Sequence, residues 1–312
     1  MRDIMNRFTI LLILLFVQGL LAQPITVESV KPLWSDNQKA FYHPRFGVGD
    51  STVFVTGSGF EGLHVININN GQLTTITEAR GAGYAFAQSP DGQYVTYRTQ
   101  EFVKRRPVYE LKRVDLKNGK ISILEADKRS LKMISTGIVA RLTYLDNATV
   151  RQSAISGENQ ILSQDDIPFV TIQRREILLW DNGEQKMLAP LGKQKYIWPS
   201  ISPDGQKLLF TAAGVGTFIS DLHGNIENEL GYANAPQWSA DGNWIVFMMD
   251  RDDGHRITAS DIYAISADGS RKIQLTASQN TIEMYPDWGH QSNKIVYNTQ
   301  DGRIFLMELT TE

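Results

Sequence analysis

The hydrophobic pattern of the chain consists of short runs of β-forming residues separated by turn dipeptides. Residues 207–211 and 244–248 are apolar runs that each follow Asp-Gly directly, and residues 260–266 and 272–276 form two further runs after later turns. Short runs of this composition predict strands, and Asp-Gly between them predicts tight hairpins. The pattern therefore predicts small units of antiparallel strands joined by short turns.

One such unit occurs twice in nearly the same form. Residues 196–211 (YIWPSISPDGQKLLFT) align with residues 234–247 (NAPQWSADGNWIVF), and Asp204 and Asp241 lie 37 positions apart. This spacing fits a four-stranded unit rather than a heptad or a helical pair. A lone four-stranded meander leaves two faces and two edges uncovered, so it needs to stack against copies of itself. Radial stacking of such units gives a β-propeller.

The number of units follows from the positions at which a repeat opens. From residue 126 to residue 195 the pattern weakens and fits either one long irregular blade or nearly two compressed blades. A seventh blade requires residues 163–166 to be a degenerate Ser-Pro-Asp-Gly turn. We predict six blades and keep seven as the alternative. The six openings are Pro44, Tyr84, Arg141, Pro199, Pro236 and Pro286.

The two ends of the chain are predicted to meet in one blade. The last unit, which opens at residues 285–288, has three strands before the chain ends. An early strand at residues 24–30 precedes the first full unit. We expect it to supply the fourth strand of the last blade, because a closed ring leaves no exposed edge.

The turn sequences resemble those of the TolB-like β-propeller family. The resemblance rests on Ser-Pro-Asp-Gly at residues 89–92 and 202–205 and on Ser-Ala-Asp-Gly at residues 239–242. It is most specific over residues 235–276 and covers most of the chain. It implies an all-β, six-bladed propeller of four-stranded antiparallel blades in a Gram-negative cell envelope, binding protein or other partners at the mouth of its central channel. The α/β domain that precedes the propeller in TolB has no counterpart among residues 23–42.

The first 22 residues have the features of a secretory signal peptide. Arg2 and Arg7 flank its start, residues 8–17 are an unbroken apolar run, and Ala22 offers a small residue before the expected cleavage site. An uncleaved membrane anchor is the alternative, but a membrane span needs about twenty apolar residues. We therefore predict residues 1–22 as a signal peptide, residues 23–312 as a single propeller domain, and a periplasmic or secreted location.

Charge and cysteine content narrow the class of partner. Loss of residues 1–22 leaves 29 basic and 33 acidic residues, and the chain has no cysteine. A mildly acidic chain is poorly suited to nucleic acid, and the absence of cysteine excludes disulfides, thiolate metal sites and a cysteine nucleophile. We expect a monomeric propeller, at most peripheral to a membrane, whose partner is an envelope protein or a glycan.

Aligning the repeats nominates one ring of residues as a binding site. The inner strands of a propeller begin at one mouth of its channel, and the positions at or just before the repeat proline include His43, Tyr84, Trp198 and Tyr285. Large amphipathic aromatic side chains there are suited to anchoring a peptide or a carbohydrate. The alternative, that they fill the channel or pack between blades, is equally consistent with the sequence.

Motifs for catalysis or for a cofactor are weak. The acidic segment at residues 250–254 has the alternating carboxylates that suit calcium, but it is too short for an EF-hand loop and is predicted to be a hairpin turn. The glycines of residues 57–62 precede another strand, so they predict a hairpin rather than a dinucleotide site. His290 occupies the proline position of a Ser-Pro-Asp-Gly turn. We predict no metal, no cofactor and no catalytic residues.

Three functions remain open at this point. The preferred one is a non-enzymatic, exported propeller that binds its partner at the channel mouth. A lyase or hydrolase on a propeller scaffold would require His43, His223 or His290 to converge with acidic residues in one pocket. A structural subunit of an envelope assembly would instead expose a large apolar patch on the rim of the blades.

Overall fold

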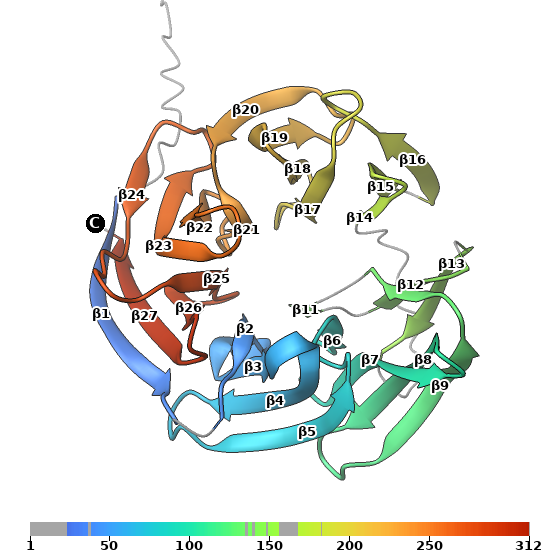
Figure 1. The fold of residues 1–312 in the computed structure, drawn as a ribbon. Helices are drawn as coiled ribbons and strands as arrows, with labels where there is room; N and C mark the ends of the chain where they lie inside the picture. Colours follow the sequence, from blue (N-terminus) through green and yellow to red (C-terminus); the bar gives the residue numbers. More distant parts are fainter. Residues whose placement is uncertain are drawn as a thin grey trace, which may run out of the picture.

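The strands of the computed structural model form a closed ring of seven sheets (Figure 1). Residues 24–36, 39–134, 137–138, 141–147, 149–155, 168–181 and 183–311 are described. The predicted signal peptide and residues 163–166 lie outside them. In this part of the chain no helix is long and apolar enough to cross a membrane.

Four of the seven blades, including the last one, have four antiparallel strands each. Blade 1 is β2 (Tyr42–Phe46), β3 (Thr52–Thr56), β4 (Glu61–Asn67) and β5 (Leu73–Arg80); blade 5 is β17 (Tyr196–Ile201), β18 (Lys207–Ala212), β19 (Gly216–Asp221) and β20 (Ile226–Gly231). Blade 6 is β21 (Asn234–Trp238), β22 (Trp244–Asp252), β23 (Ile257–Ser266) and β24 (Lys272–Gln274). Blade 7 is β25 (Glu283–Trp288), β26 (Lys294–Thr299), β27 (Ile304–Thr311) and β1 (Ile25–Trp34).

The other three blades depart from this pattern. Blade 2 is β6 (Phe86–Gln88), β7 (Tyr94–Val103), β8 (Arg106–Asp115) and β9 (Ile121–Lys128), with β11 (Gly137–Ile138) added in parallel to β6. Blade 3 is β10 (Leu131–Met133), β12 (Arg141–Asp146) and β13 (Thr149–Ala154), and blade 4 is β14 (Phe169–Gln173), β15 (Glu176–Asp181) and β16 (Glu184–Leu188).

The blade count corrects the preferred number of six to the alternative of seven. Residues 126–195, which fitted one irregular blade or two compressed ones, contain blades 3 and 4 with three strands each in the described part of the chain. The expected opening at Arg141 is also corrected, because β12 is the central strand of its sheet rather than its first. Short sheets without a complete Ser-Pro-Asp-Gly turn gave no clear repeat signal.

Closure of the ring by the N-terminal strand is confirmed. β1 pairs antiparallel with β27 along its length, from Ile25 opposite Thr311 to Trp34 opposite Ile304. Figure 1 shows the two ends of the described chain side by side in blade 7. β27 therefore has a partner on each side, as a closed propeller requires.

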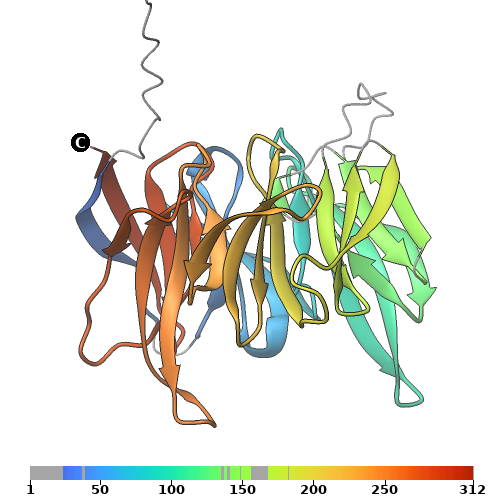
Figure 2. The ribbon, with the colours of Figure 1, turned by 90° about the horizontal axis from the view of Figure 1, so that it is seen from above.

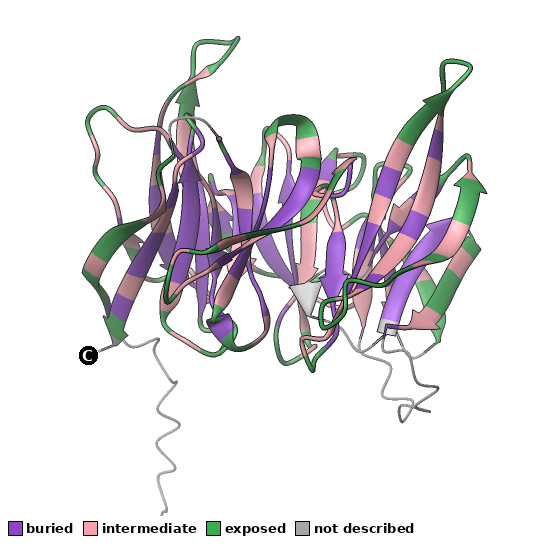
Figure 3. Ribbon diagram, turned by 90° about the horizontal axis from the view of Figure 1, so that it is seen from below, coloured by how far each residue is buried: buried purple, intermediate pink, exposed green. Residues whose placement is uncertain are grey.

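The hydrophobic core lies between neighbouring blades rather than inside any one of them. One cluster, for example, joins Trp244 and Ile262 of blade 6 to Trp288 and Ile295 of blade 7. Because each blade packs on both faces, its central strands are apolar on both sides, as in residues 207–212. Figure 3 shows this burial along the middle of the blades, with exposed residues at the hairpin tips and outer strands.

The Ser-x-Asp-Gly signature has a structural role in the turn between the first two strands of a blade. In blade 5 the Ser202 hydroxyl donates to Asp204 at 2.5 Å and accepts the amide of Lys207, while Asp204 accepts the amide of Gln206. Gly205 has a φ of 75°, which favours glycine. The repeat motif thus specifies the turn on one face of the ring and leaves the other face free to vary.

A buried aspartate replaces the missing carboxylate of this turn in blade 7. Residues 289–292 have no aspartate, and the Asp50 carboxylate of blade 1 instead accepts the amides of His290 and Gln291 at 2.9 and 2.8 Å. It also accepts the Ser292 hydroxyl at 2.7 Å. Asp50 is 5% exposed. A carboxylate from the first blade therefore stabilises the turn of the last one and links the two ends of the ring.

Candidate functional site

The inner strands begin on the face of the ring opposite the Ser-x-Asp turns, and we call this the mouth face. The hairpins between the second and third strands of the blades also turn there, as at residues 57–60 and 253–256. The long β7–β8 and β22–β23 hairpins project on the same side of the ring (Figure 2). Side chains at the start of β2, β17, β21 and β25 therefore lie near the centre of this face.

Four inner strands carry the same irregularity at their start. His43, Trp198, Ala235 and Tyr285 have φ values of 52°, 50°, 48° and 51°, and each precedes a proline. The pairing with the second strand shifts register at each of these positions, which indicates a β-bulge. A left-handed conformation costs a non-glycine residue about 1 kcal/mol or more, and bulges commonly redirect a side chain near a functional site.

Three of the four residues that the sequence nominated form a continuous aromatic arc. The rings of Tyr285 and His43 are 4.1 Å apart, and His43 stacks on Phe60 at 4.7 Å. Phe60 meets Tyr84 edge to face at 5.2 Å. We call Tyr285, His43, Phe60 and Tyr84 the mouth arc. It crosses the junctions between blades 7, 1 and 2, and Tyr84 at its end is 55% exposed.

The fourth nominated residue, Trp198, lies at the equivalent bulge of blade 5. It is 37% exposed. Blade 6 separates it from Tyr285, and the bulge residue of blade 6 is the small, buried Ala235. Within the described residues, no ring contact joins Trp198 to the mouth arc. The structure thus brings together His43, Tyr84 and Tyr285 and leaves Trp198 apart.

His43 is uncharged at neutral pH. Burial, together with the nearby Arg45 guanidinium, lowers the pKa of His43 from 6.5 to about 4. Arg45 is held in place by an ion pair of 2.8 Å with the buried Asp287 carboxylate, and the backbone amide of His43 donates to Asn298. The imidazole is therefore a neutral ring in the middle of the arc at physiological pH.

The far end of the arc carries a guanidinium between two tyrosine rings. The Arg98 guanidinium carbon lies 5.0 Å from the centre of the Tyr84 ring and 4.7 Å from that of Tyr109. One Nη donates to the Leu131 carbonyl at 3.0 Å, and the buried Nε has no hydrogen-bond partner among the described residues. Burial lowers the pKa of Arg98. The two cation–π contacts stabilise this charge, with which no carboxylate is paired in the described part of the chain.

The other end of the arc carries a carboxylate. The Asn234 side-chain amide donates to Asp250 at 2.6 Å and to the Tyr232 hydroxyl at 2.9 Å. Burial raises the pKa of Tyr285, and the Asp250 charge raises it further, which shows that Asp250 acts electrostatically on the arc. Tyr232 is half exposed. The cluster thus has aromatic rings at its centre, the Asp250 carboxylate at one end and the Arg98 guanidinium at the other. This combination makes it the most distinctive cluster on the mouth face.

The histidines do not converge. His43 lies at the mouth, whereas His290 is in the first turn of blade 7 on the opposite face, bonded through its amide to Asp50. His223 lies in the β19–β20 turn, 3.9 Å from Asp221, with a 77% exposed side chain. The described residues contain no group of three or more His, Cys, Asp or Glu that could hold a metal ion. The pocket that an enzyme of the predicted type requires is not formed by these three histidines.

The segment of residues 250–254 is part of the β22–β23 hairpin, as predicted. Asp252 accepts the amide of Gly254, and Asp253 accepts the amides of His255 and Arg256. The carboxylates therefore fix the turn. Residues 57–62 likewise form a hairpin connection, in which Phe60 has a φ of 62° and reaches the mouth arc.

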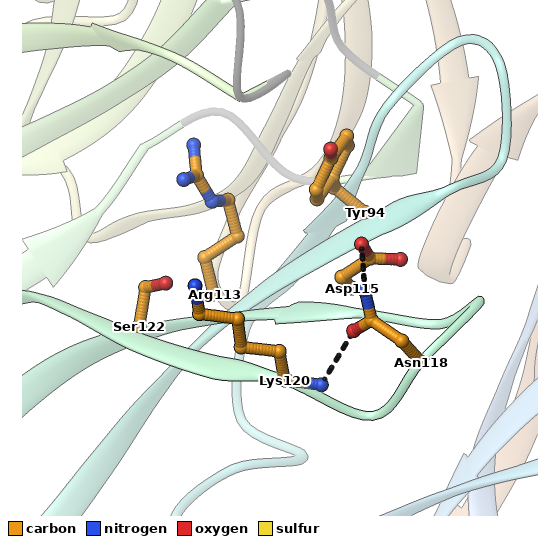
Figure 4. Close-up of a pocket in the computed structure, with 6 residues that line it drawn as sticks. All are labelled: Tyr94, Arg113, Asp115, Asn118, Lys120 and Ser122. Carbon is orange, nitrogen blue, oxygen red and sulfur yellow. Dashed lines mark hydrogen bonds between the residues drawn. The ribbon is translucent and has the colours of Figure 1, made fainter.

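A separate cavity of about 220 Å³ lies at the outer part of blade 2 (Figure 4). It is lined by Tyr94, Arg113, Asp115, Asn118, Lys120 and Ser122. The Asn118 amide bonds to Asp115, and the backbone amide of Lys120 bonds to Asn118, so the β8–β9 turn forms one wall. Arg113 lies over the Tyr94 ring and donates to the Ile155 carbonyl. The first contacts lie within blade 2, whereas the bond from Arg113 to Ile155 reaches the end of β13 in blade 3. None of them involves the mouth arc.

Comparison with known proteins adds information on the fold alone. No protein-family model and no curated protein matches the chain. Among solved structures, TolB from Acinetobacter baumannii is similar with a TM-score of 0.54 and 15% identity, covering 84% of this chain and 60% of TolB. The β-propeller domain of Cps50 (Swd1) from Myceliophteria thermophila is similar with a TM-score of 0.56 and 11% identity, covering 92% of this chain and 100% of that domain. The β-propeller fold is thereby confirmed.

A weaker likeness is found to an oligogalacturonate lyase in complex with manganese. The TM-score is 0.47 and the identity 13%, over 87% of this chain and 78% of the lyase. This chain spans 60% of the length of the TolB structure, so a shared activity does not follow from that comparison.

Several residues of the site were not nominated by the sequence. Phe60 and Asp250 come from a hairpin loop and a strand end, and Arg98 comes from a second strand; none of these positions belongs to the repeat motif. Asn234 directly precedes a bulge residue, so the repeat alignment gave a signal for it. Predicting the others requires the length and twist of each hairpin, which the repeat spacing does not specify.

Proposed function

We propose that the mature chain is an exported, non-enzymatic β-propeller that binds an envelope protein or a glycan at the centre of its mouth face. The mouth arc is the observation that carries this proposal. Half-exposed aromatic side chains in mutual contact offer a large, rigid, amphipathic surface at little cost in conformational entropy. His43 and Tyr285, held at nearly the same positive φ in neighbouring blades, bring their rings to 4.1 Å from each other.

Export is supported by the sequence of residues 1–22, which has the three regions of a signal peptide. A propeller in an envelope compartment would meet its partner without a membrane span of its own. The proposal places the partner on the mouth face, because the opposite face is occupied by turns whose polar groups bond to one another.

Affinity purification from the native cell envelope tests the proposal. The tagged mature chain is compared with Tyr84→Ala/Tyr285→Ala, with Trp198→Ala, and with the control Phe102→Ala. Phe102 is 53% exposed on the β7–β8 hairpin of the same face but packs on Arg80, away from the arc. Melting curves establish that each variant is folded.

We expect the partner to be captured by the wild type and by Phe102→Ala and lost from the double variant. Equal capture by a folded double variant would contradict binding at the mouth arc. Loss from Trp198→Ala as well would extend the binding surface across blade 6. Equal amounts of each purified, tagged chain are added to the envelope extract, so that loss of a partner cannot be confused with loss of export.

A second candidate, a structural subunit that assembles through its rim, has one observation in its favour. Ile121 and Ile123 on β9, the outer edge of blade 2, are 51% and 59% exposed. An exposed apolar edge strand is a template for pairing with another chain. This reading predicts that Ile121→Thr/Ile123→Thr loses the captured partner and that the mouth variants keep it.

A further inference from the structure

The mouth arc ends at Tyr285 of blade 7, and the next bulge residue, in blade 6, has no aromatic ring. In ring order the bulge residues are Trp198 of blade 5, Ala235 of blade 6 and Tyr285 of blade 7. Ala235 is buried in the cluster against which Tyr285 also packs. Blade 6 therefore contributes no large side chain at the position where its neighbours contribute Trp and Tyr.

Polar groups of the same blade and of the segment before it lie next to this bulge in the sequence and are bonded to one another. Tyr232 directly precedes blade 6 and is 50% exposed, and its hydroxyl accepts a hydrogen bond from Asn234. Asn234 in turn donates to the Asp250 carboxylate at 2.6 Å. The amide of Asn234 thus orients both the tyrosine hydroxyl and the carboxylate, which fixes their positions before any ligand binds.

The Asp250 carboxylate is half buried and has no cationic partner in the described part of the chain, although other acidic residues of the propeller do. Asp253, three residues further along the same hairpin, is 3.7 Å from Arg256, and the buried Asp287 pairs with Arg45. Burial and the Asp250 charge both raise the pKa values of Tyr232 and Tyr285. Asp250 therefore acts electrostatically on both tyrosines, and the Asn234 amide links it to Tyr232 through hydrogen bonds.

We propose that the surface formed by Asp250, Tyr232 and Tyr285 receives a basic side chain, Lys or Arg, from a polypeptide partner. This inference rests on the proposed binding at the mouth face. The cationic head pairs with Asp250, and its apolar stem and charge lie against the rings of Tyr232 and Tyr285. Cations are attracted to the faces of aromatic rings, and a carboxylate fixed by a hydrogen bond supplies directional pairing.

A peptide library and a charge-matched pair of variants test this inference. Random heptapeptides are selected on the mature chain, and the tightest binders are resynthesised with Lys replaced by norleucine or Arg by citrulline. Dissociation constants are measured for the wild type, Asp250→Asn and Asp253→Asn. Asp253→Asn is the matched control, because it removes the same charge from the same hairpin and an asparagine retains the turn hydrogen bonds.

We expect selected peptides to be enriched in Lys or Arg, and we expect loss of the charge on either side to weaken binding about tenfold. Asp250→Asn combined with the neutral peptide should be little worse than either change alone, and Asp253→Asn should have almost no effect. Selection without basic residues, or additive effects of the two changes, would overturn the inference.

The test separates this inference from the proposed function. If Tyr84→Ala/Tyr285→Ala abolishes peptide binding while Asp250→Asn does not, the mouth binds peptide and the basic-side-chain inference is wrong. If no peptide is selected and a glycan array gives a ligand that depends on the mouth arc, the proposed function stands and a peptide partner is excluded. If neither kind of ligand depends on the arc, both fail.

Discussion

Acidification should destabilise the propeller through His43 at the centre of the mouth arc. Burial beside Arg45 holds the pKa of His43 at about 4 in the folded chain, against 6.5 ordinarily. Above pH 6.5 the histidine is neutral in both the folded and the unfolded chain and has no effect. As the pH falls from 6.5 to 4, the unfolded chain takes up a proton that the folded chain does not, so stability is lost.

The size of the effect follows from the two pKa values. Their difference of about 2.5 units, at 1.36 kcal/mol per unit, corresponds to about 3 kcal/mol lost by pH 4. In the variant His43→Asn this loss should be absent, since asparagine does not titrate. Asparagine also tolerates the φ of 52° at this position.

Urea unfolding of the wild type and His43→Asn between pH 7 and pH 4 measures the difference. The carboxylates common to both proteins cancel in this comparison. We expect the stability of the wild type relative to the variant to fall by about 3 kcal/mol over this range. His223→Asn, which replaces a 77% exposed side chain, is the control. A wild-type-minus-variant difference that stays constant with pH would refute the reasoning.

Three further predictions concern the closure of the ring. Asp50→Ala should lower the free energy of unfolding in urea by about 3 kcal/mol, because it removes three hydrogen bonds to the blade 7 turn. The control Asp252→Ala, at an exposed residue, should lower it by less than about 1 kcal/mol, and equal losses would contradict the role of Asp50. Gly302→Ala should cost about 2 kcal/mol or more, because its φ is 83° and a Cβ would lie 2.3 Å from that of Ala40; an unchanged melting temperature would contradict this. Deletion of β1 should uncover β27 and produce aggregates on size-exclusion chromatography, and an elution profile unchanged from that of the intact chain would contradict closure by β1.

The features that were predicted from the sequence are those that the repeat imposes on every blade. Asp204 and Gly205 act within a single turn, so their signal is local and appears in each good copy. β1 was predictable as the fourth strand of blade 7 because closure of the ring demands it. The location of His43, Tyr84 and Tyr285 followed from the same periodicity.

The remaining features depend on contacts between blades or on hairpin geometry. Asp50 serves a turn that is about 240 residues away in sequence, and nothing in its own blade indicates that role. Blades 3 and 4 are short, so their strands lack the turn motif that would have separated them. Phe60 lies in the β3–β4 connection and Asp250 near the end of β22, and the spacing of apolar residues does not determine where these hairpins place their side chains.

Amide hydrogen exchange of residues 23–312, alone and with a partner obtained by the affinity purification proposed above, tests the central claim most directly, since it reports which face is covered. The account predicts that binding slows exchange at residues 57–60, 81–84 and 232–235 on the mouth face, and leaves the turns at residues 202–205 and 239–242 on the opposite face unchanged. Protection confined to those turns, or to the outer strand β9, would contradict binding at the mouth arc.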